Sequence, residues 1–280
     1  MGQKMKSKNE IYDPQNFSLS DTFWETIQHL FISKKRKGPG RPPMEPRKAL
    51  TAIFFIFVTG CQWKYLPRHL GAKSTVHEHF QRWVEQGIFH QIWTLSLELY
   101  DELIGIQWQW QSMDGCHIVA PLGGEDVGPS YKHRTKNGSN RSLLTDQKGI
   151  PLAIVLAPAN RNDFKLTELT LESMPISRPD PKIVTQNISL DKGYDYTEID
   201  LLLERLQYVA HTSRKGSFRI LPELKVHDSK RWVVERTHAW MNNFRSVFIR
   251  WTKKYINYMA FLHLSCAMIT FRAAGVITKI

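Results

Sequence analysis

Residues 230–245 read Lys-Arg-Trp-Val-Val-Glu-Arg-Thr-His-Ala-Trp-Met-Asn-Asn-Phe-Arg. The stretch contains no Gly or Pro, and the Asp-Ser pair that directly precedes it supplies an N-cap, so the sequence predicts a helix. Residues three and four positions apart share a helix face, which places Glu235 beside Arg231 and His238, with Asn242 one turn further on. The apolar residues of this stretch lie on another side of the predicted helix, which can pack inward. The predicted helix therefore presents one acid within a polar, mostly basic stripe.

Taken alone, Glu235 and Arg231 would form an ordinary exposed ion pair, which contributes a fraction of a kcal/mol. Two further acids change this interpretation. Asp114 lies inside a predicted strand, where Asp is disfavoured, although it could also be a turn residue before Gly115. Asp191 follows an apolar strand-like run, and functional carboxylates gather at the carboxyl ends of strands in open α/β sheets.

The composition favours a polyanionic partner. The chain has 280 residues, with 38 Lys and Arg against 26 Asp and Glu, which gives a net charge of +12. Nucleic acid is the first candidate, although charge alone does not separate DNA, RNA and anionic lipid. The cysteines have no zinc or disulfide spacing, which indicates a reducing cytoplasm. The apolar stretch 255–277 is interrupted by polar residues, so we expect a packed helix and no membrane partner.

The first part of the chain predicts a helical DNA-binding region. Residues 16–32 predict a short helix, and the Gly- and Pro-rich basic stretch that follows carries Arg36 and Arg41, which suit DNA phosphates or the minor groove. A plain solvated linker is the alternative. Three further helices, at 46–59, 75–86 and 89–104, are typical of a helix-turn-helix-like module, or of a small bundle that only packs on the rest.

The second part predicts a sheet interleaved with helices. We expect strands at 108–120, 141–145, 150–157, 183–190 and 207–212, and helices at 164–173, 196–206, 230–245 and 255–274. A long loop between the first two strands carries Lys132, Arg134 and Lys136, which suit a phosphate backbone. We interpret Asp146 as a hairpin-turn residue and Asp163 as a helix N-cap.

The three remaining acids predict a metal site. Asp114, Asp191 and Glu235 are far apart in sequence, but two acids on strands and one on a late helix can converge at one edge of a sheet. Carboxylate oxygens suit Mg²⁺ or Mn²⁺. Two such ions can clamp the attacking and leaving oxygens of a phosphoryl transfer. The basic surroundings would then hold the nucleic acid.

Several stretches together resemble the prokaryotic insertion-sequence transposases of the Asp-Asp-Glu (DDE) type, and the insertion-sequence-five family in particular. The matching stretches, spread over residues 107–272, are Met113-Asp114-Gly115, residues 138–141 with 145–146 and 149–152, residues 157–163, residues 190–194, and residues 231–237. The resemblance implies an α/β class with an RNase-H-like mixed sheet flanked by helices. It divides the chain into a basic tail and linker (1–45), a small all-α helix-turn-helix-like domain (46–106) and a catalytic domain (107–280).

The resemblance also implies a mechanism. Asp114, Asp191 and Glu235 would hold two Mg²⁺ or Mn²⁺ ions, cut the ends of the element to leave a 3′-hydroxyl, and direct that hydroxyl at target DNA without a covalent protein–DNA intermediate. The broader signature has Tyr and Lys at the positions of Asp228 and Asn242, so the phosphate contacts they would make pass to other residues. We assign transposon-end contacts to a group on the late helix: Arg231, His238, Asn242 and Arg245.

The expected partners are terminal inverted repeats, target DNA and further copies of the chain assembled on DNA. The expected location is the prokaryotic cytoplasm, at the nucleoid. Two other functions fit the same residues less completely. A structure-selective nuclease on the same fold would cut without joining, and a DNA-binding regulator of its own element would need none of the three acids.

Overall fold

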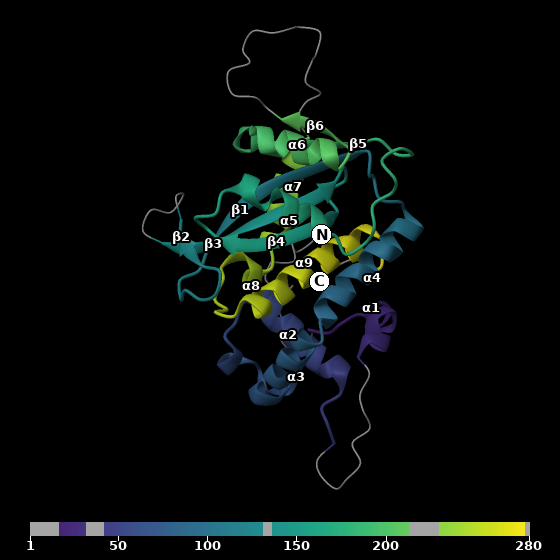
Figure 1. The fold of residues 1–280 in the computed structure, drawn as a ribbon. Coiled ribbons are helices and arrows are strands. Elements are labelled where there is room, and N and C mark those ends of the chain that lie inside the picture. The colour runs from purple at the N-terminus through teal and green to yellow at the C-terminus, as the bar shows by residue number, and fades with distance from the viewer. Residues whose placement is uncertain (1–16, 32–41, 131–135, 213–229, 278–280) are drawn as a thin grey trace, which may run out of the picture.

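The computed structural model describes residues 17–31, 42–130, 136–212 and 230–277 (Figure 1). Its α-helices are α1 (Asp21–Ile27), α2 (Pro46–Thr59), α3 (Lys73–Glu85), α4 (Ile88–Leu103), α5 (Thr167–Glu172), α6 (Thr197–Arg205), α7 (Trp232–Asn242), α8 (Arg245–Phe248) and α9 (Tyr255–Ala273). Its strands are β1 (Trp110–Val119), β2 (Gly128–Pro129), β3 (Asn137–Asp146), β4 (Pro151–Pro158), β5 (Gln186–Leu190) and β6 (Tyr208–Thr212). Short 3-10 helices are η2 (Gln28–Leu30), η3 (Trp63–Tyr65), η4 (Arg68–Leu70), η5 (Asp163–Leu166) and η6 (Lys192–Tyr194).

The strands form one mixed sheet in the order β2-β3-β1-β5-β6, with β4 also paired to β3. Strands β1, β3 and β4 are antiparallel neighbours, whereas β5 runs parallel to β1 and β6 runs parallel to β5. The change from antiparallel to parallel pairing therefore occurs at β1, which pairs with β3 on one side and with β5 on the other. The predicted class, a mixed sheet with helices on its faces after an all-helical region, is confirmed.

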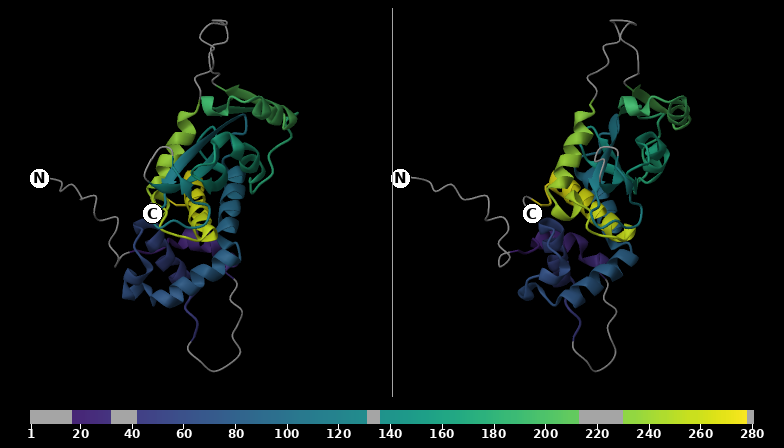
Figure 2. Two further views of the ribbon diagram at one scale, coloured as in Figure 1. Left: turned by 60° about the vertical axis from the view of Figure 1, so that its left-hand side comes forward. Right: turned by 90° about the vertical axis from the view of Figure 1, so that its left-hand side faces the viewer.

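Helices cover both faces of this sheet, and strand β3 shows which helix lies on which face. The Arg141 guanidinium reaches His238 of α7, whereas the next residue, Ser142, accepts a hydrogen bond from Thr170 of α5. Since successive side chains on a strand point to opposite faces, α7 and α5 lie on opposite sides of the sheet (Figure 2). Helix α9 packs on β4 and α7 and closes the α7 side.

The β3–β4 hairpin fixes the position of α7. The buried Asp146 carboxylate accepts hydrogen bonds from the N–H groups of Lys148 and Ile150, both at 2.8 Å, which confirms it as a turn residue. Burial raises its pKa despite these bonds. The Thr237 hydroxyl on α7 donates to the carbonyl of Gly149 at 2.8 Å. The turn thus holds the helix that carries Glu235 against the sheet.

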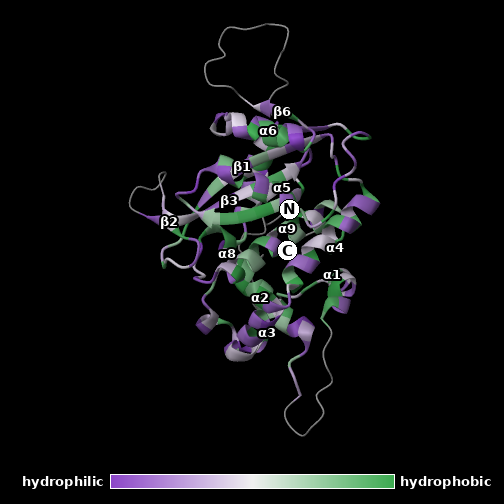
Figure 3. Cartoon of the chain, viewed as in Figure 1, coloured by the Kyte–Doolittle hydropathy of each residue, from purple (hydrophilic) through white to green (hydrophobic). Residues whose placement is uncertain are grey.

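The helical region shares its core with the sheet region. The Phe57 ring of α2 stacks on Phe244 and Phe261, with centroids 4.3 Å and 6.0 Å apart, and α4 lies along α9. Buried apolar residues from both regions belong to one cluster, and α2 and α9 carry long hydrophobic stretches (Figure 3). The division near residue 106 therefore stays a prediction. No helix among the described residues is both long and apolar enough to cross a membrane.

Several predicted helix starts were wrong by a few residues. Helix α1 begins only at Asp21, because the Ser20 hydroxyl accepts a hydrogen bond from the N–H of Phe23 and caps it there. Helix α3 begins at Lys73, two residues before the predicted start at residue 75. The predicted Asp-Ser cap of the helix at 230–245 lies outside the described residues.

Candidate active site

Asp114 lies in the middle of β1, opposite Leu143 of β3. Its Oδ1 accepts a hydrogen bond from the N–H of Gly115 at 2.8 Å. Burial raises the pKa of this carboxyl from 3.8 to about 6; the negative charges of Asp163 and Asp191 add to the rise, while the Gly115 bond and Arg231 oppose it. The strand therefore holds a partly buried acid close to two others.

Asp191 directly follows β5, at the carboxyl end of that strand, as the sequence predicted. Its Oδ1 accepts a hydrogen bond from the N–H of Gly193 at 2.7 Å and caps η6. Strands β1 and β5 are parallel, and Ser112 pairs with Ser189. This is the last pair between the two strands, and Asp114 and Asp191 each follow it by two residues along the chain.

Glu235 is linked to Asp114 by Arg231, which interacts with both carboxylates. The Arg231 Nη2 lies 3.4 Å from Oε1 of Glu235, and 55% of the Glu235 side chain is exposed. The same guanidinium opposes the rise in the pKa of Asp114. Arg231 thus supplies positive charge between the sheet acids and the acid of α7. The charges of Asp191 and Arg231 both act on the carboxyl of Asp114, and Arg231 also forms the ion pair with Glu235.

Asp163 belongs to the same cluster, and its predicted role as an N-cap was wrong. The cap residue of η5 is Asn162, and no side chain makes a capping hydrogen bond there. The Asp163 carboxylate instead accepts a hydrogen bond from Nδ2 of Asn140 at 2.5 Å and lies over Gly115, where a Cβ would be 1.9 Å from Oδ1. The glycine that follows Asp114 was the available sequence signal, because glycine permits such close approach.

Tyr194 lies beneath these acids. Its side chain is fully buried, and its hydroxyl has no hydrogen-bond partner within the described part of the chain. Burial raises its pKa well above the ordinary value, and the charges of Asp163, Asp114 and Asp191 raise it further. A buried polar atom without a partner is costly, and an ordered water molecule would satisfy this hydroxyl.

The donors suit a hard divalent cation. Within residues 17–31, 42–130, 136–212 and 230–277, no three His, Cys, Asp or Glu side chains are close enough together to hold a metal ion by themselves. Mg²⁺ is usually held by one or two carboxylates and completes its shell with water and substrate phosphate oxygens. The charges of Asp163 and Asp191 raise the pKa of Asp114. A bound divalent cation would offset this repulsion.

The predicted DNA contacts separate into four groups, and the first is Arg231, which is paired with Glu235. His238 is 6% exposed; its ring lies against Nη2 of Arg141 and the backbone carbonyl of Asp114. The side chain of Asn242 also accepts from Arg141. The His238 ring is therefore buried against the sheet, whereas Asn242 is half-buried. Arg245 and Lys136 are exposed. The remaining predicted contacts, Arg36, Arg41, Lys132 and Arg134, lie outside the described residues.

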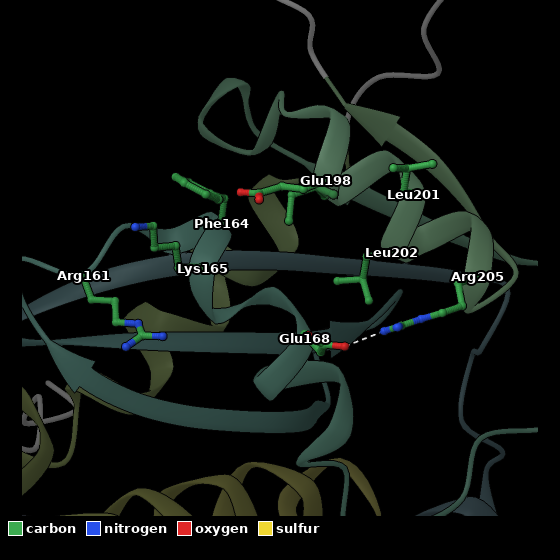
Figure 4. A pocket seen from close by; sticks show the side chains of 9 residues that line it. Arg161, Phe164, Lys165, Glu168, Glu198, Leu201, Leu202 and Arg205 are labelled. Carbon is green, nitrogen blue, oxygen red and sulfur yellow. Dashed lines mark hydrogen bonds and ion pairs between the residues drawn. The ribbon is translucent and has the colours of Figure 1, made fainter.

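A cavity of about 600 Å³ lies beside η5. It is lined by residues of η5, α5 and α6, and Figure 4 shows Glu168 and Arg205 paired across its far end. Arg161 and Phe164, which flank Asp163 closely in sequence, line it as well. The Phe164 ring stacks on Tyr196 at 4.0 Å. The cavity thus borders the segment that carries Asp163.

Comparisons with known proteins agree with this geometry. The profile of the family described as Transposase DDE domain matches residues 110–270, and that of an IS4/5-family transposase region matches residues 19–93. A Burkholderia cepacia protein described as a transposase for insertion sequence element IS402 is 31% identical over 163 residues, covering 51% of this chain and 67% of that protein. An uncharacterized 16.2 kDa protein of the same element is 30% identical over 115 residues, covering 39% and 78%.

Among solved structures, a piggyBac transposase synaptic complex with hairpin DNA aligns over 94% of this chain and 75% of its own, with a TM-score of 0.50 and 10% identity. This likeness concerns the fold and confirms the RNase-H-like expectation. The family profile, which covers more than half of the chain, and the Burkholderia relative carry the assignment. The chain belongs to the DDE transposases of insertion sequences.

Proposed function

We propose that the chain cuts the ends of its insertion sequence in a Mg²⁺- or Mn²⁺-dependent reaction and joins the resulting 3′-hydroxyl to target DNA, with Asp114, Asp191 and Glu235 as the catalytic acids. The adjacent positions of Asp114 and Asp191 at the point where pairing changes from antiparallel to parallel carry this proposal. Two bound ions would stabilise the attacking and leaving oxygens of the phosphoryl transfer.

The protein residues would orient this chemistry. Asp114 and Asp191 are fixed by the N–H groups of Gly115 and Gly193. Glu235, being largely exposed, can turn toward an ion once Arg231 shifts to a DNA phosphate, since guanidinium groups bind phosphate as readily as carboxylate. The sheet would thus supply fixed acids, and α7 would supply a movable one.

The proposed partners are terminal-repeat DNA and target DNA, and we expect several copies to assemble on paired ends. The net charge of +12 supports a DNA partner. The piggyBac complex also contains DNA, which supports the same class of partner. A prokaryotic cytoplasmic location at the nucleoid forms part of this proposal.

Cleavage of the cognate terminal repeats in the presence of Mg²⁺ tests the assignment. We expect Asp114→Ala, Asp191→Ala and Glu235→Ala each to lose cleavage while DNA binding persists. Glu102→Ala, which removes an exposed acid on α4, is the matched control and should cut normally. Full cleavage by any of the three site variants would refute the assignment. Cutting without joining would instead indicate a nuclease, and binding without cutting by the unmodified chain would indicate a regulator.

A further inference from the structure

Two tryptophans and one arginine form a row along the outer side of α7, which we call the Trp-Arg-Trp row (Trp232, Arg236 and Trp240). The guanidinium carbon of Arg236 lies 4.7 Å from the centroid of the Trp232 ring and 4.6 Å from that of the Trp240 ring. Residues four positions apart are neighbours on a helix, so these side chains stack on one another. Trp232 nevertheless remains 57% exposed and Trp240 36% exposed. The row therefore presents aromatic surface to solvent.

The β3–β4 turn holds this row in place. The Nη2 of Arg236 donates a hydrogen bond to the carbonyl of Lys148 at 2.6 Å. Gly149 lets the turn approach closely, because a Cβ at this position would lie 3.1 Å from that Nη2 and 3.3 Å from the Trp240 ring. The side chains are thus ordered before any partner binds, and a pre-ordered surface loses less conformational entropy on binding.

The fold explains the arginine of the row but not its two exposed rings. Arg236 anchors the turn through Lys148, whereas neither tryptophan belongs to the apolar core of the described residues. A cation–π contact at the surface contributes little to stability. Trp and Arg are, however, among the residue types enriched at the positions that dominate binding to a partner. These observations favour a binding surface over a structural role.

The row lies beside the proposed catalytic acid of α7, and its surroundings are basic. Trp232 precedes Glu235 by three residues, which places their Cβ atoms about 5–6 Å apart. Arg231 pairs with Glu235 from the preceding turn, and the Lys230 ammonium lies 4.8 Å from the centroid of the Trp110 ring. A DNA strand whose phosphate reaches Glu235 would pass these cations, and a neighbouring base would come within reach of Trp232.

We propose that the Trp-Arg-Trp row binds an unpaired base of the DNA strand held at the catalytic acids, with Trp232 as the stacking ring. A tryptophan stacks on the flat face of a base. Within a duplex both faces of a base are covered by its neighbours, so the row can bind only a base that has left the stack. The positive charge of Arg236 attracts the same strand. This inference rests on the proposed function and adds a preference for unpaired DNA beside the cut.

The experiment measures the binding of the full chain to a labelled oligothymidine strand and to a labelled blunt duplex, by fluorescence anisotropy in EDTA. We expect Trp232→Ala to bind the single strand about 5- to 150-fold more weakly, the range for the loss of one base–aromatic stack, and to bind the duplex as the parent does. Trp232→Phe, which keeps a ring, should restore part of the affinity. Trp251→Ala removes a ring of similar exposure (51%) from another part of the chain and should change neither affinity.

Three results would overturn the row as a binding site for an unpaired base: the parent chain fails to bind oligothymidine, Trp232→Ala binds it as tightly as the parent, or Trp232→Ala loses affinity for strand and duplex equally. A lower thermal midpoint of Trp232→Ala with unchanged strand affinity would assign the ring to the fold. None of these results bears on the cleavage test of Asp114→Ala, so the proposed function can stand while the base-binding site is refuted. Full cleavage by Asp114→Ala would refute the proposed function and, with it, the placement of the base beside the acids.

Discussion

Replacement of Asp114 by Asn should stabilise the metal-free protein. The carboxylate is partly buried in β1, and its folded-state pKa is raised from 3.8 to about 6, chiefly by burial and further by Asp163 and Asp191. The ionised form therefore opposes folding at neutral pH. Asn keeps a side-chain oxygen for the N–H of Gly115, so the local hydrogen bond survives the change.

The size and sign of the effect follow from the pKa shift. A rise of about two units corresponds to at most about 3 kcal/mol of lost stability when the group is ionised in both states. Because the folded-state pKa is the higher one, the cost grows as the pH rises from about 4 to about 6 and is constant above. Asp114→Asn should therefore gain stability at pH 7.5 and gain little near pH 4.

Urea unfolding in EDTA at pH 7.5 and at pH 4.5 measures the difference directly. We expect the Asn variant to unfold at a higher urea concentration at pH 7.5, with an unchanged slope, and the gap to narrow at pH 4.5. Glu102→Gln, an exposed change of the same charge, should show no such gap. A variant less stable than the parent at pH 7.5, or one with an equal gain at both pH values, would refute a charge-based origin.

Three further outcomes follow from other parts of the fold. Gly115→Ala should displace Asp163 and cost about 1–3 kcal/mol through overpacking, with reduced DNA cleavage as the second readout. Arg250→Lys should cost about 3 kcal/mol or more in chemical unfolding, because the buried guanidinium donates to Ser139 Oγ and to the carbonyls of residues 125, 126, 252 and 253. His263 stacks on Trp93, and burial lowers its pKa to about 3. The free energy of unfolding should therefore fall as the pH drops below 6.5, by up to about 1.4 kcal/mol per pH unit. His263→Phe should reduce this pH dependence when unfolding is compared at pH 7 and pH 5.

The sequence located the sheet and two of its acids because local chemistry determines them. Helix α2 spans the predicted residues 46–59, since Pro46 starts it and Gly60, in the left-handed conformation, ends it. Asp191 was placed correctly because an apolar strand leads directly into it. These features depend on neighbours in the chain, which the sequence displays.

The N-cap prediction for Asp163 was wrong, and the burial of His238 was not predicted, because the surroundings of both residues come from distant segments. An Asp at the start of a helix has the same local pattern whether it caps the helix or reaches across to another strand. Only the approach of η5 to Gly115 of β1 separates the two cases. His238 shares a helix stripe with Glu235, but the buried Arg141 of β3 draws its ring inward. Neither contact is encoded within one stretch of sequence.

The packing of α9 between the sheet and the helical region has a mechanical consequence. One side of α9 rests on β4 and another on α4, while Phe57 of α2 is wedged against Phe244 and Phe261. A fragment cut at residue 106 would expose this apolar seam to water and should aggregate. In the intact chain the two parts share this apolar core. If the helical region binds the terminal repeat, the shared core would fix the distance between the bound DNA and the catalytic acids. The number of base pairs between the binding site and the cleavage site would then be constant.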